Sequence, residues 1–169
     1  MVEDWQEIIT RRYRESRGDS TILFEAMVAL AHKHGMDAVL AHLQRCVIEK
    51  RLAWLDAHGP RLARTGNPIM DGYRAFYEAY LGLSIPRDGE IVALTDRRLV
   101  TRWWNACPTL AACTGCGLDT RVICRKVYHE PVSIFLSRID RRLTFARNYA
   151  VLRPYGPYCE EIIELSDTE

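Results

Sequence analysis

The sequence predicts an α+β fold in which N-terminal helices pack on a four-stranded antiparallel sheet made of two hairpins separated by short helices. Two observations predict this fold. Apolar residues in the first half recur every three or four positions, the period of one helix face. The second half instead contains two pairs of β-rich runs, each pair joined by a turn segment. The 169 residues suffice for a single domain, with a helical part at about 1–83 and a sheet and cysteine-rich part at about 88–165.

The chain begins with a short amphipathic segment around Trp5, which is interrupted at residues 16–20. Asp19 or Ser20 then offers an N-cap, because its side-chain oxygen can accept a free N–H of the first helical turn. The helix that follows is expected to end at Gly35, since glycine readily adopts the left-handed conformation found at helix ends.

Two more helices are expected before the sheet. One spans about 37–58, and the next begins at the cap pair Asn67–Pro68 and ends at Gly82. One side of this last helix carries an aromatic stripe of Tyr73, Phe76, Tyr77 and Tyr80. We expect the stripe to belong to the core or to a pocket wall.

The second half alternates hairpins and helices. The first hairpin is expected to pair strands 90–94 and 98–104, and the second to pair strands 143–151 and 158–165. Between the hairpins, the expected helices occupy residues 108–116, 121–128 and 131–138. Hairpins produce antiparallel neighbours, so the four strands form one antiparallel sheet.

Composition excludes several classes of protein. Hydrophobic residues (48%) and charged residues (27%) are balanced as in globular proteins, and the formal net charge of +1 gives no general attraction to nucleic acid. No apolar run approaches the roughly 20 residues of a membrane helix. The acidic start over residues 1–4 lacks the apolar core of a signal peptide. We therefore expect a cytoplasmic protein that binds neither nucleic acid nor membranes.

Six cysteines are the most informative residues of the chain, because structural disulfides are not expected in the cytoplasm. Four of them form a C-x5-C-x2-C-x7-C pattern between Cys107 and Cys124. Cys159 lies on the last predicted strand, from which it could reach the same end of the sheet. Cys46 is expected to be separate, on the inner face of an N-terminal helix.

Three interpretations of these thiols stay open from the sequence alone. Buried cysteines often serve as small hydrophobic residues. Alternatively, they hold a metal, for which zinc is the best candidate; its ligands would come from Cys107, Cys113, Cys116, Cys124 and Cys159. In the third interpretation a thiolate is catalytic. Cys107 is best placed for this role, because it precedes a predicted helix whose free amides and dipole stabilise a thiolate.

Other side chains could support this chemistry. The candidate bases or orienting groups for a catalytic thiolate are His129, Glu130 and Asp119. Arg147 and Arg153 lie near tyrosines and could bind a carboxylate bidentately. Glu161 falls on the same face of the last strand as Cys159, because side chains alternate along a strand. It is therefore a candidate acid, base or ligand.

Residues 88–165 resemble the L-2-amino-thiazoline-4-carboxylic acid hydrolase family. The resemblance rests on a hairpin, a cysteine-containing segment, the run Leu-Thr-Phe-Ala-Arg-Asn (143–148) and the run Tyr-Gly-Pro-Tyr-Cys-Glu (155–160). The layout is also similar to the 4-vinyl reductase type of ligand-binding domain. By position, Cys107 matches the cysteine after the first hairpin, Arg147 the arginine of the penultimate strand, and Cys159 the cysteine of the last strand.

This chain departs from both patterns. Gly156 is followed by Pro157 and Tyr158, where the hydrolase pattern has a shorter turn before its final cysteine. The acidic and cysteine residues of the last hairpin are fewer than in the vinyl-reductase pattern. Cys113, Cys116 and Cys124 belong to neither pattern.

The resemblance implies a small-molecule hydrolase of the aminothiazoline-carboxylate type, acting on a C–N bond of a small heterocycle. A Cys107 thiolate, or a water on a cysteine-bound metal, would attack the ring carbon while Arg147 holds the substrate carboxylate. Cys107, Arg147 and Cys159 are then the candidate catalytic residues. The alternative is a non-catalytic sensor or carrier domain of the 4-vinyl reductase type, whose cysteines hold a structural metal. Both expect a small-molecule partner, and both are compatible with a homodimer. The cofactor is expected to be zinc or none.

Overall fold

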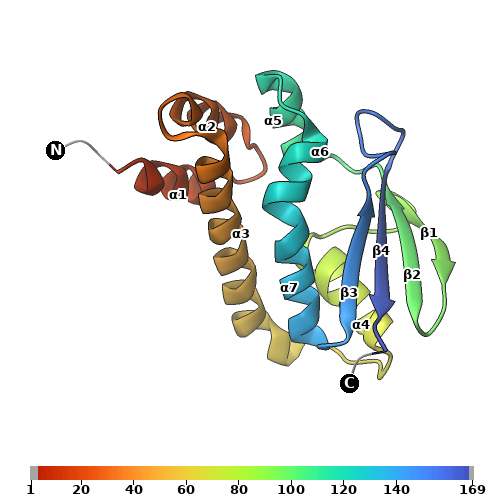
Figure 1. Cartoon of the computed structure of the whole chain (residues 1–169). Coiled ribbons are helices and arrows are strands. Elements are labelled where there is room, and N and C mark those ends of the chain that lie inside the picture. The colour runs from red at the N-terminus through yellow and green to blue at the C-terminus, as the bar shows by residue number, and fades with distance from the viewer. Residues whose placement is uncertain (1–3, 168–169) are drawn as a thin grey trace. The chain divides into compact units, whose positions relative to one another are not determined.

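The computed structural model describes residues 4–167 and confirms the predicted α+β class (Figure 1). The described chain divides into two compact units. A helical unit comprises residues 4–49 and 107–128, and a sheet unit comprises residues 50–106 and 129–167. The helical part predicted for residues 1–83 is therefore shared between the two units. No helix within residues 4–167 has both the length and the apolar character needed to cross a membrane.

The helical unit is built around one apolar core. Its elements are α1 (Trp5–Glu15), α2 (Thr21–His34), the first part of α3 (Met36–His58), α5 (Pro108–Cys116) and α6 (Thr120–Ile123). The buried side chains that form the core are Ile9, Leu23, Phe24, Met27, Val39, Leu40, Leu43, Val47, Ala112, Cys113, Ile123 and Val127. Their three- and four-residue spacing is the pattern that predicted helices in this region.

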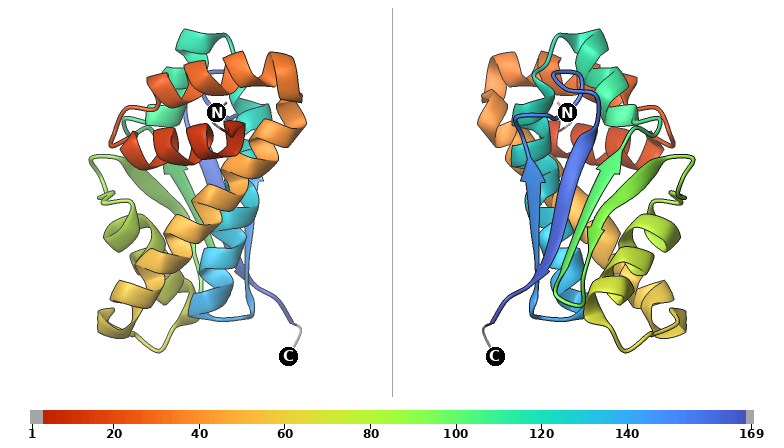
Figure 2. Two further views of the ribbon diagram at one scale, coloured as in Figure 1. Left: turned by 90° about the vertical axis from the view of Figure 1, so that its left-hand side faces the viewer. Right: turned by 90° about the vertical axis from the view of Figure 1, so that its right-hand side faces the viewer.

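The sheet unit contains one antiparallel sheet in the order β1-β2-β4-β3. Its strands are β1 (Gly89–Leu94), β2 (Arg98–Trp103), β3 (Leu143–Asn148) and β4 (Cys159–Leu165). The right-hand view of Figure 2 shows this order across the sheet. The two predicted hairpins are thus joined side by side through β2 and β4.

Helices of the sheet unit cover one face of the sheet (Figure 1). They are α4 (Pro68–Tyr73), its π-helical continuation η2 (Arg74–Tyr80) and α7 (Glu130–Ile139). The core between them and the sheet includes Ile69, Tyr73, Phe76, Tyr77, Leu99, Trp103, Phe135, Leu136, Phe145 and Ile163. We call this side of the sheet the covered face. The predicted aromatic stripe is therefore largely core.

The helices between the two hairpins differ from the prediction. Residues 121–128 and 131–138, predicted as two short helices, form one continuous helical segment of α6, the π-helical η3 (Cys124–His129) and α7. Pro131 suggested a break because it lacks the backbone N–H of a regular helix. The wider π-helical turn immediately before it lets the segment continue, since local changes of helical pitch absorb such a disruption.

At two predicted helix starts, a nearby side chain accepts backbone N–H groups of the first helical turn. The Asn67 side chain accepts the N–H groups of Ile69 (2.9 Å) and Met70 (3.3 Å), as predicted for an N-cap. At the start of α2, Ser20 occupies the cap position without a side-chain bond, and Asp19 Oδ1 accepts the N–H of Thr21 at 2.8 Å. Of the two candidate caps, the carboxylate therefore makes the bond.

Replacing Asn67 with Ala should lower the free energy of unfolding by about 1 kcal/mol, because two N–H groups of α4 lose their acceptor. Urea denaturation followed by circular dichroism measures this loss. Asn67→Asp is the matched control, since it keeps an acceptor oxygen at the cap. Equal losses in the two variants would contradict the capping role.

Candidate functional site

A buried ion pair lies on the covered face of the sheet. Arg147 of β3 and Glu161 of β4 are register partners, and Arg147 donates from Nε (2.8 Å) and Nη2 (2.5 Å) to Oε1 of Glu161. Their side chains are only 9% and 8% exposed. Burying two charges is costly unless further hydrogen bonds satisfy them. Such clusters are therefore candidate functional sites.

Tyr77, on the π-helical segment η2, binds the second oxygen of this carboxylate. Its hydroxyl donates to Oε2 of Glu161 at 2.8 Å, and its ring stacks on Trp103 with 4.7 Å between centroids. Burial, followed by the negative charge of Glu161, raises the pKa of Tyr77 well above its ordinary value. The phenol therefore stays protonated and acts as a donor. Irregular π-helical turns often occur at functional sites.

Strand β2 contributes a hydrogen-bonded pair beside the carboxylate. Trp103 donates from Nε1 to Oγ1 of Thr101 at 2.8 Å, and the Thr101 hydroxyl donates to the backbone carbonyl of Glu161 at 3.4 Å. Thr101 pairs in register with Glu161, and Trp103 pairs with Cys159. These contacts orient β4 at the position where the two predicted site residues stand.

Cys159 and Glu161 stand two residues apart on β4, and both face the covered side. Two residues of a strand span about 6.6 Å between Cα atoms. Cys159 is partly buried and packs against the core of the sheet unit. The alternation of side chains along a strand predicted that this thiol and this carboxylate share a face, and they do. We refer to Tyr77, Thr101, Arg147, Cys159 and Glu161 as the covered-face cluster.

His129 approaches this cluster through an aromatic contact. Its Nδ1 is 2.9 Å from the hydroxyl of Tyr149, and its ring meets the ring of Phe145 edge-on at 5.3 Å. The guanidinium of Arg147 lies over the same Phe145 ring, also at 5.3 Å. The sheet unit thereby provides a thiol, a carboxylate, a phenol and an imidazole on one side of the sheet.

The remaining predicted site cysteines belong to the helical unit. Cys107 caps α5, where its sulfur accepts the N–H of Leu110 at 3.5 Å, in the position that the sequence predicted. Cys113 is buried, and burial first, then the neighbouring thiols of Cys124, Cys107 and Cys116, raises its pKa to about 12. Burial also raises the pKa of Cys116. High pKa values disfavour the thiolate, which is the form that attacks electrophiles and binds metals.

Residues 4–167 contain no group of three or more His, Cys, Asp or Glu side chains placed to hold one metal ion. A structural zinc site needs four converging ligands. Within the helical unit, the described side chains of Cys107, Cys113, Cys116 and Cys124 do not form such a site. Zinc binding stays a prediction of the sequence, and no step of the chemistry below uses a metal.

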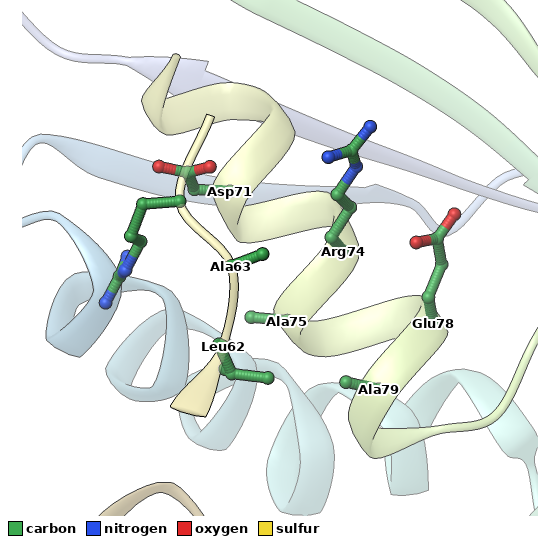
Figure 3. Close-up of a pocket in the computed structure, with 8 residues that line it drawn as sticks. Leu62, Ala63, Asp71, Arg74, Ala75, Glu78 and Ala79 are labelled. Carbon is green, nitrogen blue, oxygen red and sulfur yellow. The ribbon is translucent and has the colours of Figure 1, made fainter. Parts of the chain in front are cut away.

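A separate pocket of about 360 Å³ lies between residues 62–64 and the helix of α4 and η2 (Figure 3). The apolar part of its lining consists of Leu62, Ala63, Ala75 and Ala79. The carboxylate of Asp71 is held in place, because its Oδ1 accepts the N–H (2.7 Å) and the hydroxyl (2.8 Å) of Thr65. Figure 3 shows Arg74 and Glu78 extending outward from the helix. This volume falls within the range of small-ligand sites.

Two arginines that were candidates for binding a substrate carboxylate have hydrogen-bond partners within the chain. The carboxylate next to Arg147 is Glu161 of the chain itself, so the guanidinium already has an anionic partner. Arg153 donates from Nη1 to the backbone carbonyl of Asn105 at 2.9 Å and thereby ties two loops together. Sequence reasoning also missed the polar role of Tyr77, because its place in an apolar stripe suggested packing alone.

Comparisons with protein-family models, with curated proteins and with solved structures find no match for this chain. Its function is therefore inferred from geometry and chemistry.

Arg147→Met should lower the free energy of unfolding by about 3–5 kcal/mol, because it leaves the Glu161 carboxylate buried without its cation. The double variant Arg147→Met/Glu161→Gln should lose less than the sum of the two single losses, as measured by urea denaturation. Arg98→Met is the control, since it breaks the exposed pair with Glu164 and should cost at most about 1 kcal/mol. Strict additivity in the double variant would show that the two buried side chains are not coupled.

The raised pKa of Tyr77 predicts a pH dependence of stability. Above about pH 10 this tyrosine ionises in the unfolded chain but stays protonated in the folded one, so the free energy of unfolding falls as the pH rises. Tyr77→Phe should remove that part of the alkaline loss, and denaturation curves between pH 8 and about 11 measure it. Parallel pH profiles in the two proteins would contradict this assignment.

Proposed function

We propose that the sheet unit hydrolyses a small cyclic amidine-type substrate of the aminothiazoline-carboxylate class, with Cys159 as the nucleophile. One observation carries the proposal. The carboxylate of Glu161 is held from two sides by Arg147 and Tyr77, and it stands two residues from Cys159 on the same face of β4. A fixed carboxylate beside a thiol is an arrangement suited to orienting a substrate for nucleophilic attack.

Glu161 supplies a means of recognising the ring. An aminothiazoline carries two nitrogen atoms on its electrophilic carbon, and their N–H groups are natural donors to a carboxylate. Oε1 of Glu161 accepts two N–H groups of Arg147, whereas Oε2 accepts one hydroxyl and retains a lone pair. A substrate N–H bound to Oε2 would bring the adjacent ring carbon towards the Cys159 side of the strand.

The proposed reaction adds one water to the substrate. The Cys159 thiolate bonds to the ring carbon between the two nitrogens, the ring C–S bond breaks, and the departing sulfur takes a proton. Water then attacks the same carbon, and Cys159 leaves as the thiol, which releases N-carbamoyl-cysteine. The bond that breaks is thus the C–S bond of the ring, and both C–N bonds at that carbon remain. This differs from the C–N cleavage expected from the sequence.

The remaining polar groups receive supporting roles. Histidine is the side chain used most often for proton transfer at neutral pH, and we assign the transfers to His129, which Tyr149 orients. Arg147 acts as a positioning residue for Glu161, because its guanidinium is engaged by that carboxylate. The substrate carboxylate, for which Arg147 was predicted, would therefore bind elsewhere.

A second candidate function is ligand binding without catalysis, as in a sensor or carrier domain. The pocket of about 360 Å³ beside Asp71 favours it, because its apolar lining and anchored carboxylate suit a small amphipathic ligand. This pocket does not include Cys159, so the two functions depend on different residues.

Incubation of the purified chain with aminothiazoline carboxylate should release N-carbamoyl-cysteine, detected by liquid chromatography and mass spectrometry. Cys159→Ser should lose roughly 10³-fold in turnover, because it removes the nucleophile. Cys107→Ser should keep the wild-type rate, which separates the two cysteines that the sequence proposed. Unchanged turnover in the Cys159 variant, or its loss in the Cys107 variant alone, would overturn the assignment. A chain without turnover would instead favour the binding function.

A further inference from the structure

A buried carboxylate borders the pocket of about 360 Å³ between residues 62–64 and the helix of α4 and η2 (Figure 3). Asp71 is 8% exposed, whereas the other charged residues of the lining, Arg64, Arg74 and Glu78, are exposed. All of these residues belong to the sheet unit. Among the lining residues, the buried charge is therefore negative.

The two oxygens of this carboxylate differ in their hydrogen bonds. Oδ1 of Asp71 accepts the backbone N–H (2.7 Å) and the hydroxyl (2.8 Å) of Thr65, which uses both of its lone pairs. Within residues 4–167, Oδ2 has no hydrogen-bond partner and the carboxylate forms no ion pair. The lone pairs of Oδ2 are therefore available to a ligand.

The arginines of the lining do not neutralise Asp71. Arg64 donates from Nη1 to the backbone carbonyl of Ile139 at 3.5 Å, which holds its guanidinium towards the end of α7. Figure 3 shows Arg74 extending outward from the helix. Asp71 lies in the first turn of α4, where the helix dipole favours an anionic side chain. Because a buried anion without a counter-ion is costly, a cation bound at Oδ2 would be stabilised.

The apolar lining determines what else the ligand contains. It consists of Leu62, Ala63, Ala75 and Ala79, and the short side chains of the three alanines leave space beside the helix. Figure 3 shows Asp71 near one end of this lining and Ala79 near the other. A ligand with its cationic end at Asp71 would thus place an apolar body along these residues. The volume lies near the lower end of the range for small-molecule sites, so that body is short.

We propose that this pocket binds primary amines, with the ammonium group at Oδ2 of Asp71 and a short alkyl or aryl body against the apolar lining. An ammonium is a compact donor that can bind a single oxygen, whereas a guanidinium fits a carboxylate best through both oxygens. Thr65 occupies Oδ1, so the site favours an amine over a guanidine. The inference names the ligand class for the second candidate function, ligand binding, and rests on that function.

Titration of the full isotope-labelled chain, followed by NMR of its backbone amides, tests the proposal. The probes are hexylamine and phenethylamine, which are cationic at about pH 7, and the carboxylates of matched length, hexanoate and hydrocinnamate. At least one amine should bind with saturation and shift the amides of residues 62–65 and 71–79, whereas the carboxylates should not. Hexylguanidine should bind more weakly than hexylamine.

Variants of the lining test the role of the buried charge. Asp71→Asn should weaken amine binding about tenfold or more, because the hydrogen bond loses its charged acceptor, while Asn keeps an acceptor oxygen for Thr65. Glu78→Gln is the matched control, since it removes an exposed negative charge from the same lining and should change the affinity by at most about twofold. Ala79→Leu fills the far end of the lining and should also weaken binding.

Two kinds of failure can be told apart. Carboxylates that bind as tightly as the amines, hexylguanidine that binds more tightly than hexylamine, or equal losses in Asp71→Asn and Glu78→Gln would overturn the ligand class. No saturable shift with any probe would overturn the binding function together with it. If Asp71→Asn does not fold by circular dichroism, the comparison of amines with carboxylates in the unaltered chain decides. Hydrolytic turnover is a separate result, because Cys159 does not line this pocket.

Discussion

The buried pair of Arg147 and Glu161 is the constraint on which the sheet unit depends. It joins β3 to β4 at one register position, and a slip of one strand by one residue would turn its charge to the opposite face and separate the pair. Tyr77 extends the constraint to η2, because its hydroxyl binds the second carboxylate oxygen. The cost of burying two charges is thus offset only in one arrangement of two strands and a helix. That arrangement also determines which groups lie beside Cys159.

The features of the fold and the candidate site that depend on neighbouring residues in the sequence could be predicted. Cap residues such as Asn67 act over two or three positions, and strand alternation places Cys159 and Glu161 on one face, so a single sequence is sufficient for both. The bond between Tyr77 and Glu161 joins residues 84 positions apart. Nothing local distinguishes this tyrosine from its apolar neighbours in the stripe. The partner of Arg147 depended in the same way on the pairing of β3 with β4.

A high number of cysteines in one segment of the sequence does not mean that those cysteines are reactive. Cys113 lies in the cysteine-rich segment, yet burial and neighbouring thiols raise its pKa to about 12, which keeps it protonated. Cys46 is isolated in the sequence, yet its sulfur lies 3.5 Å from the Thr10 hydroxyl and 3.7 Å from Nε2 of His42. Donors and charge around a sulfur atom, rather than the number of nearby cysteines, decide whether it is a nucleophile. The pocket beside Asp71 was missed for a related reason, since residues 62–66 carry no pattern that marks a binding site.

In the proposed mechanism, the fixed carboxylate of Glu161 presents a substrate to Cys159. The most direct measurement is the mass of the intact chain after acid quench of a reaction with aminothiazoline carboxylate, followed by peptide mapping of any adduct. The account predicts a covalent adduct of one substrate mass on the peptide that contains Cys159, and its absence in Glu161→Gln. An adduct on the peptide that contains Cys107, or turnover without any adduct, would contradict it.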